Sequence, residues 1–437
     1  MFTWYCTYHL LSTEAFQCVL FLHVLRCSLM QQLSFRIFLL ASLVAGLVLY
    51  FILSRFLHVL PYTAALFIAG TVTGALVKRY DFGTFTESTD MWSRIDGELL
   101  LLTFLPGLLF KDAYNLDVHL FIKSFGQIMI MAFPMVLAGT VLMALFAKII
   151  LPYGWSFNLC MTFGSILSAT DPVAVSALLN ELGAPPRLKM HICGESLFND
   201  GSAIVFYTIF KALFLYENGI HGSEDVTLVS GIITFVRMSV GGTGVGLAFG
   251  GVLSGFLYLL KRRFDDEECV VQVMATFVTA YLTFYVAEPV LHTSGVIAVV
   301  ICGITTRAFA RMLIQDHEMM TKFWLLVEHI LNTLLFILGG VLWGMVISNV
   351  DPPHLVESFG LQEWGFLVVI FIMMTIVRFF LFSVFYPIIS RIGTKSCWQE
   401  MVFQSFGGLR GAVGIALALA LDSEVGKYSH FCGYRYR

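Results

Sequence analysis

Long apolar stretches separated by short polar segments run through most of the chain. A helix that crosses the hydrocarbon core of a bilayer needs about 20 mainly apolar residues. By this measure the pattern predicts an all-α polytopic membrane protein with about twelve spans, near residues 37–57, 60–77, 98–110, 124–150, 157–180, 194–217, 231–260, 269–290, 293–310, 324–348, 364–390 and 400–421. The third stretch is the shortest and contains Pro106 and Gly107.

The predicted spans form one transmembrane domain over residues 37–421, preceded by an N-terminal segment and followed by a short tail. Within residues 1–36 an apolar stretch is interrupted by His23 and Arg26, which fits a degenerate signal anchor, an interfacial helix or a gene-model artefact. With twelve spans, the tail at residues 422–437 ends outside the cytoplasm, and a thirteenth span would return it to the cytoplasm. We therefore expect a truncated tail or a missing thirteenth span.

The short loops on alternate sides of the predicted spans differ in positive charge. Three Lys or Arg residues fall on one side, at 78, 79 and 94. Eleven fall on the other, at 111, 123, 187, 189, 261, 262, 263, 311, 322, 391 and 395. The positive-inside rule predicts that the richer side is cytoplasmic.

Composition agrees with a membrane protein and excludes several other classes. Hydrophobic residues make up 58% of the 437 residues and charged residues 13%, against roughly a quarter charged in ordinary globular chains. The net charge is -3 and no basic stripe is present, so no nucleic-acid partner is expected. None of the nine cysteines forms a C-x-x-C pair, so neither a zinc site nor a redox motif is indicated, and no cofactor is expected.

Four predicted spans hold ionisable groups in suggestive settings, and the first of these settings is the stretch GSILSATDPV, residues 164–173. Pro172 lacks a backbone N–H and disfavours helical geometry at the preceding residue, so we predict that the helix breaks near Thr170 and Asp171. Irregular backbone at membrane depth persists only where it lines a buried or watery cavity. There Thr170 would coordinate a cation and Asp171 would neutralise the amino-terminal end of a half-helix. A loop misplaced by the span boundaries is the alternative.

The second group lies in GESLFNDGSA, residues 194–203, where a predicted helix carries two carboxylates, Glu195 and Asp200. Asn199 precedes Asp200 directly, and Ser196 lies one helical turn before it. A carboxylate in a partly desolvated cavity can bind a proton or a hard monovalent cation, but not both at once. That competition is the minimal requirement for an exchanger. Alternatively, Asp200 caps a helix or pairs with an arginine.

Two arginines lie in later spans. A guanidinium keeps its charge, so Arg378 requires a carboxylate partner, for which Glu195 and Asp171 are the candidates. Arg410 stands among glycines in FGGLRGAVG, which reads as a second broken helix whose carbonyl end Arg410 would offset. Two broken helices in opposite halves of the chain indicate inverted repeats around a central ion site. Glu328 is either a supporting carboxylate of that site or an interface residue.

Four of these stretches together resemble the sodium/proton exchanger family: SATDPVAVSALLNELGA, GESLFNDGSAIVF, EHILNTLLFILGG and FGGLRGAVGIALAL. FLPGLLFKDAYNLDVH, residues 104–119, is similar to the third span of that family and the loop after it. The resemblance runs from about residue 37 to 421 and is greatest to the plant salt-overly-sensitive plasma-membrane type and the sperm-specific type. It implies an inverted-repeat antiporter fold with two broken crossing helices.

The resemblance also implies roles for individual residues. Asp200 would alternate between a proton and a cation, and Asn199 would be its partner in a pair that goes with electroneutral one-for-one exchange. Thr170 and Asp171 would complete a Na+ site with Asp200, with Ser196 close by.

Further roles follow from the same likeness. Glu195 and Arg378 would form a buried ion pair, and Arg410 would balance the second unwound helix. The family's fold comprises thirteen spans, a core domain and a dimerisation domain, and moves in an elevator-like manner. We therefore expect a membrane-embedded homodimer with no enzymatic activity, in the plasma membrane or an endomembrane, with any cytoplasmic regulators encoded outside this chain.

Several alternatives remain open from the sequence. A truncated, non-transporting homologue that regulates a full-length exchanger and a K+/H+ exchanger both fit the motifs. A cation channel would not need a titrating aspartate. An intramembrane aspartyl protease places its aspartates in Gly-x-Gly-Asp, unlike Thr-Asp-Pro and Asn-Asp-Gly here.

Overall fold

The computed structural model describes residues 29–56, 60–171, 175, 179, 183–218, 228–260, 268–348, 361–393, 397–408 and 410–432. Every regular element in these ranges is helical, as predicted. The chain divides into two compact units, one comprising residues 1–95 and 332–359 and the other residues 96–331 and 360–437. The predicted segment at residues 1–36 lies mostly outside the described residues, although helix α2 already begins at Leu29.

The first unit contains α2 (Leu29–Phe56), α3 (Tyr62–Arg79), α4 (Thr84–Ser93) and the carboxyl-terminal part of α14 (His317–Ile347). Helices α3 and α14 approach each other closely at Gly70 and Gly340, since a Cβ added to either glycine would overlap the backbone of the other helix. Small residues allow helix backbones in membranes to approach closely. The α4 helix is short and polar, and the hydrophobic pattern did not predict it.

The second unit contains the remaining helices. They are α5 (Gly97–Asn115), α6 (Val118–Ala132), α7 (Pro134–Ile150), α8 (Phe157–Ser168), α10 (Pro186–Glu217), α11 (Leu228–Leu260), α12 (Glu268–Tyr285), the π-helical turn η1 (Val286–Val290), α13 (Gly295–Ala310), the 3-10 turn η2 (Arg311–Leu313), the first part of α14, α15 (Leu361–Ile389), α16 (Trp398–Phe406) and α17 (Ala412–Cys432).

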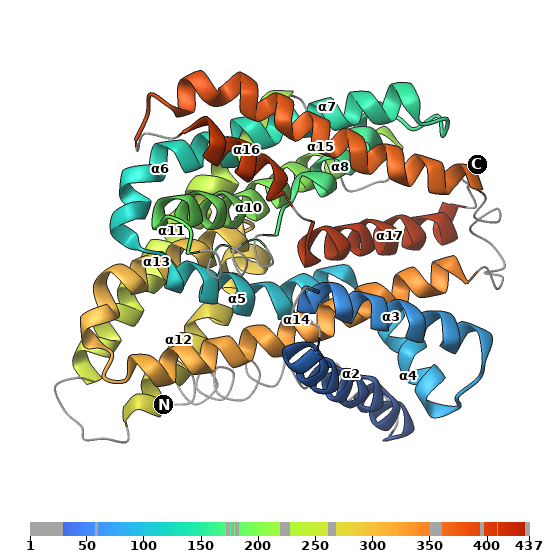
Figure 1. Ribbon diagram of the computed structural model, residues 1–437, viewed down its shortest axis with the longest axis horizontal. Helices are drawn as coiled ribbons and strands as arrows, with labels where there is room; N and C mark the ends of the chain where they lie inside the picture. Colours follow the sequence, from blue (N-terminus) through green and yellow to red (C-terminus); the bar gives the residue numbers. More distant parts are fainter. Residues whose placement is uncertain are drawn as a thin grey trace, which may run out of the picture. The chain divides into compact units, whose positions relative to one another are not determined.

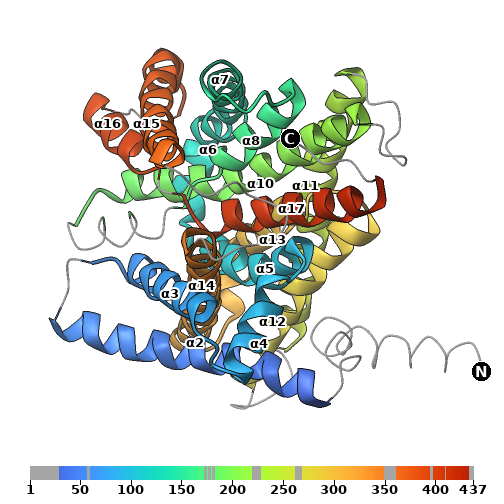
Figure 2. The same ribbon diagram turned by 90° about the vertical axis from the view of Figure 1, so that its right-hand side faces the viewer.

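Helix α10 is the central helix of this unit. It packs against α6, α8, α11, α13 and α17, and α8 packs against α7 on its other side (Figures 1 and 2). Its residues from Leu188 to Tyr207 are mostly buried, although many of them are polar. A polar helix in this position requires that its side chains find partners inside the protein.

Two predicted spans differ from the helices in the structure. The single span predicted at 124–150 is two helices, α6 and α7, which meet at Phe133 because Pro134 has no N–H to continue the ladder and is well suited to the first turn of a new helix. The span predicted to end at 421 continues as α17 to Cys432, so the predicted tail at 422–437 is largely helical in its described part. Apolarity falls off before the helix ends, and helix ends need not coincide with the hydrophobic stretch.

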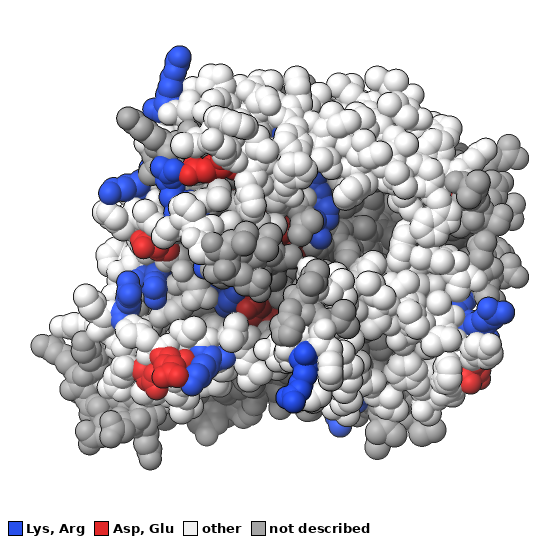
Figure 3. Space-filling model, in the orientation of Figure 1, with Lys and Arg blue, Asp and Glu red and all other residues white. Residues whose placement is uncertain are grey.

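Seven helical segments in the described part of the chain are long and apolar enough to cross a membrane, judged by length and composition; one of them, Val118–Ile150, comprises α6 and α7 together. The described parts of the other predicted spans are helical apart from the interruptions after Ser168 and Phe406, and these helices are shorter or carry more polar residues. The face shown in Figure 3 is mostly free of charged side chains, which lie mainly in the left half and the centre of that view. An uncharged surface of this kind suits contact with lipid.

Candidate ion-binding site

The first interrupted helix ends where the sequence predicts. α8 stops at Ser168, and Ala169 already has extended backbone angles, φ -62° and ψ 132°. Residues 172–174, 176–178 and 180–182, which belong to the same predicted span, lie outside the described residues. The break leaves the carbonyl oxygens of Ser168, Ala169 and Thr170 without helical partners, so other elements must satisfy them.

Two polar side chains of α10 bind these freed oxygens. Asn199 Nδ2 donates to Ser168 O at 2.9 Å and to Thr170 Oγ1 at 3.0 Å, and the Ser196 hydroxyl donates to Thr170 O. Thr170, Ser196 and Asn199 are all almost completely buried. Asn199 Oδ1 is also buried and has no hydrogen-bond partner within the described residues. The interruption of α8 is therefore held in place by one face of α10.

Asp200 occupies the neighbouring face of α10, about 100° around the helix from Asn199. It is partly exposed. Its carboxylate receives no hydrogen bond and forms no ion pair among the residues that the structure describes. Asp171 and Asp112 bring further negative charge into its surroundings. A carboxylate without a fixed partner, near other carboxylates, is free to exchange a proton for a cation.

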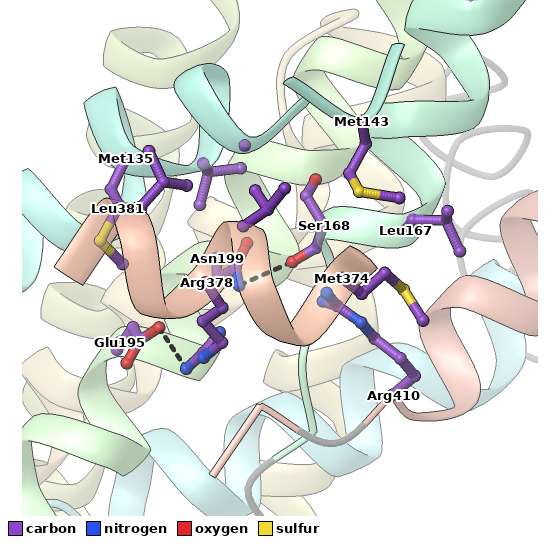
Figure 4. Close-up of a pocket in the computed structure, with 13 residues that line it drawn as sticks. Met135, Met143, Leu167, Ser168, Glu195, Asn199, Met374, Arg378, Leu381 and Arg410 are labelled. Atoms are coloured by element: carbon purple, nitrogen blue, oxygen red, sulfur yellow. Dashed lines mark hydrogen bonds and ion pairs between the residues drawn. The ribbon is translucent and has the colours of Figure 1, made fainter. Parts of the chain in front are cut away.

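Glu195 has a very different environment. Arg378 Nη2, on α15, lies 2.8 Å from Glu195 Oε1, and Gln404 Nε2, on α16, donates to Glu195 Oε2 at 2.8 Å. Arg378 also donates to the Gln404 carbonyl at 3.3 Å. The side chain of Glu195 is 2% exposed and that of Arg378 13%. Of the two carboxylates proposed for Arg378, the structure pairs it with Glu195 (Figure 4).

The second interrupted helix lies between α16 and α17, as predicted from its glycines. Arg410, in the connecting segment, donates from Nη1 to Ala169 O at 2.9 Å. A positive charge therefore offsets the carbonyl end of α8. Gly411 is required because a Cβ at this position would overlap Asp171, and Gly408 because a Cβ would lie 2.6 Å from Arg378 Cδ.

A small cavity connects these groups. Its polar lining comprises Ser168, Glu195, Asn199, Arg378 and Arg410. The apolar lining includes Met135, Met143, Leu167, Met374 and Leu381 (Figure 4). Asp200 does not line this cavity, since it projects from the adjacent face of α10.

Glu328 lies further away from the predicted site. Its Oε1 pairs with Lys111 Nζ at 2.8 Å, and the same ammonium lies 3.0 Å from Asp112 Oδ1. The side chains of Lys111 and Glu328 are 16% and 13% exposed. Glu328 thus shares the Lys111 ammonium with Asp112, one of the carboxylates around Asp200.

Three contributors were not predicted from the sequence. Gln404 orients the Glu195 carboxylate, Asp112 adds charge near Asp200, and Ser168 supplies a carbonyl to Asn199. Gln404 and Asp112 could have been noticed as polar residues within or directly after apolar stretches. The backbone role of Ser168 carries no sequence signal.

Two interrupted helices meet near the Asp200 carboxylate, while Arg378 is bound to Glu195 and Arg410 to the Ala169 carbonyl. This arrangement is typical of a polytopic membrane protein of the secondary-transporter type. Comparison with known proteins specifies which one. Residues 39–432 match the profile of the family described as "Sodium/hydrogen exchanger, transmembrane". The chain belongs to the sodium/hydrogen exchanger family.

Individual relatives agree with this assignment. The chain is 34% identical to sodium/hydrogen exchanger 7 of Arabidopsis thaliana over 84% of this chain and 31% of that protein. It is 32% identical to the Na(+)/H(+) antiporter NhaP of Pseudomonas aeruginosa over 77% of this chain and 76% of that protein. The sodium proton antiporter MjNhaP1 from Methanocaldococcus jannaschii shares the fold, with a TM-score of 0.68 at 18% identity, covering 92% of this chain and 88% of that one. The chain spans 31% and 47% of the length of two Arabidopsis exchangers that it matches.

Proposed function

We propose that this protein exchanges a monovalent cation, with Na+ as the expected ion, for a proton across a membrane, and that both ions compete for Asp200. The observation that carries the proposal is the Asp200 carboxylate, which has no hydrogen-bond or ion-pair partner in the described part of the chain and stands beside an interrupted helix. Family membership and the antiporter names of the relatives support the same activity.

The surrounding groups suit a small hard cation, which prefers oxygen ligands. Asp200 and Asp171 would supply carboxylate oxygens, and Thr170 would supply its hydroxyl or carbonyl oxygen. Asn199 and Ser196 act on the backbone: by binding the oxygens of residues 168 and 170 they keep the interruption open. A proton on Asp200 removes the charge that retains the cation, so the two ions bind alternately.

One-for-one stoichiometry follows from the number of exchangeable carboxylates. Glu195 is committed to Arg378 and Gln404, and Asn199 carries no charge. If Asp200 alone exchanges its ligand, one proton replaces one monovalent cation and no net charge crosses the membrane. We infer electroneutral exchange by alternating access, in a homodimer in the plasma membrane, serving pH and salt homeostasis.

The test uses purified protein in proteoliposomes that contain a pH-sensitive dye. Na+ and K+ gradients are imposed in turn. In the Na+ experiments, valinomycin and K+ hold the membrane potential at zero or at a negative value. Wild type is compared with Asp200→Asn and with Glu318→Gln, a matched control that removes one carboxylate from an exposed ion pair with Lys322.

We expect Na+-driven proton flux in wild type and Glu318→Gln, independent of potential, and none in Asp200→Asn. Flux driven by K+ alone would identify a K+/H+ exchanger. Absence of flux from folded wild-type protein would contradict the proposal and favour a non-transporting chain that acts through a partner. Flux that persists in Asp200→Asn would show that the exchange site lies elsewhere.

A further inference from the structure

A second group of charged side chains gathers at the carboxyl-terminal end of α10. Tyr207 and Lys211 follow Asp200 by seven and eleven residues. At 100° per residue both lie within about 20° of the direction of Asp200, and at 1.5 Å per residue Lys211 is about 16 Å further along the helix. One face of α10 therefore leads from Asp200 to this second group.

Three helices contribute to it. Lys211 Nζ lies 2.7 Å from Glu424 Oε1, on α17, and 5.4 Å from the centroid of the Tyr207 ring. Glu98, in the first turn of α5, interacts with both Glu424 and Lys211. The side chains of Lys211 and Glu424 are 16% and 20% exposed, so the pair is partly removed from solvent.

The group contains more acceptors than its one lysine satisfies. Tyr207 is 3% exposed, and its hydroxyl has no hydrogen-bond partner among the described residues. Glu424 Oε2 is likewise buried without a partner there. Asp96 and Glu288 add negative charge through their interactions with Glu98. Within the described part of the chain, Lys211 is the one basic side chain that interacts with Glu98, Glu424 or Glu288.

Buried oxygens without partners are unfavourable. A surplus of carboxylates around one ammonium, next to a tyrosine whose buried hydroxyl has no partner among the described residues, suits a small hard cation. An ammonium group on a flexible four-carbon stem can leave such a position by rotation of its side chain alone.

We propose that Glu98, Tyr207 and Glu424 form a second monovalent-cation site, which the Lys211 ammonium fills in this conformation and leaves when Na+ enters. By the predicted orientation this site lies toward the side of the membrane opposite the Lys- and Arg-rich loops. Its role as a stage on the route to Asp200 rests on the proposed exchange activity, whereas its ability to bind Na+ does not.

Binding is therefore tested without transport, in the Asp200→Asn background. Thermal unfolding in detergent is recorded while NaCl replaces choline chloride at constant ionic strength. Lys211→Gln removes the internal competitor, and we expect its half-saturating Na+ concentration to fall about tenfold, which corresponds to about 1.4 kcal/mol. Lys211→Arg keeps the charge and is expected to resemble the parent. Lys322→Gln is the matched control, because Lys322 pairs with Glu318 at an exposed position.

Adding Glu424→Gln to Lys211→Gln is expected to abolish the Na+-dependent shift, and adding Tyr207→Phe to weaken it. The proposal is overturned if folded Lys211→Gln protein shows no difference between Na+ and choline, which would leave Lys211 and Glu424 as a sealing ion pair. It is also overturned if the shift survives Glu424→Gln. Na+ binding here together with absent flux in the liposome experiment would contradict the exchange activity while supporting the site.

Discussion

The ion pair between Glu195 and Arg378 offers a quantitative test of how the core of the second unit is stabilised. Glu195 receives hydrogen bonds from Arg378 and from Gln404, and it is 2% exposed. In Glu195→Gln the shape is retained but the charge is lost. Arg378 then keeps the Gln404 carbonyl at 3.3 Å as a partner, which does not neutralise it.

Removing one partner of a buried ion pair typically costs about 3–5 kcal/mol, because the other charge stays behind unpaired. Replacing both partners is often close to neutral. We therefore expect Glu195→Gln and Arg378→Met each to destabilise by about 3 kcal/mol or more, and the double variant to lose much less than the sum. The expected coupling energy is about 2–3 kcal/mol, well above the roughly 0.6 kcal/mol average of hydrogen bonds between membrane helices.

The assay is a double-mutant cycle by reversible unfolding in mixed micelles, followed by tryptophan fluorescence, since neither substitution involves a tryptophan. Lys322→Gln serves as the control and is expected to change stability by less than about 1 kcal/mol, because its pair is exposed. A double variant whose loss of stability equals the sum of the two single losses would refute the reasoning. That outcome would mean that water or lipid headgroups solvate Arg378 and that the pair contributes little.

Two further predictions concern the segment between α16 and α17 and the residue that precedes Asp200. Gly411→Ala is expected to abolish exchange, because its Cβ would overlap Asp171. Gly407→Ala is expected to retain exchange, because the nearest neighbours of its Cβ would lie at 3.4 Å. Proton flux in liposomes is compared for the two variants, and equal activity would contradict the close approach of Gly411 to Asp171. Asn199→Asp adds a second exchangeable carboxylate beside Asp200, so proton flux is expected to become sensitive to an imposed membrane potential. Flux that stays independent of the potential would show that position 199 takes up no proton.

The all-helical class and both interruptions could be predicted because they depend on local chemistry. Pro172 and the glycines around Arg410 restrict or free the backbone wherever the chain folds. The division at Phe133 was missed, although Pro134 is the same kind of signal, because apolarity continues on both sides of it. The extension of α17 beyond residue 421 was missed for the opposite reason, since the helix continues after the apolar stretch ends.

Partners in space were harder to predict than elements. Arg378 had two candidate carboxylates in the sequence, and only the tertiary contacts of Arg378 and Gln404 select Glu195. Gln404 is an ordinary polar residue until the tertiary fold brings it to Glu195, and Asp112 is one until the packing of α5 against α10 brings its charge near Asp200. A sequence shows which charges need compensation, but the tertiary structure decides which ones receive it.

The way in which the charged side chains are paired explains why an ion site can form at Asp200. Both arginines near the interrupted helices are already engaged, Arg378 by Glu195 and Arg410 by the Ala169 carbonyl. Neither is therefore free to neutralise Asp200. The negative charge of Asp200 is left without a partner among the described residues, and an unbalanced charge inside a membrane protein is costly. Only a mobile positive ion, either a proton or a small cation, can balance it, and this requirement is the physical basis of the proposed exchange.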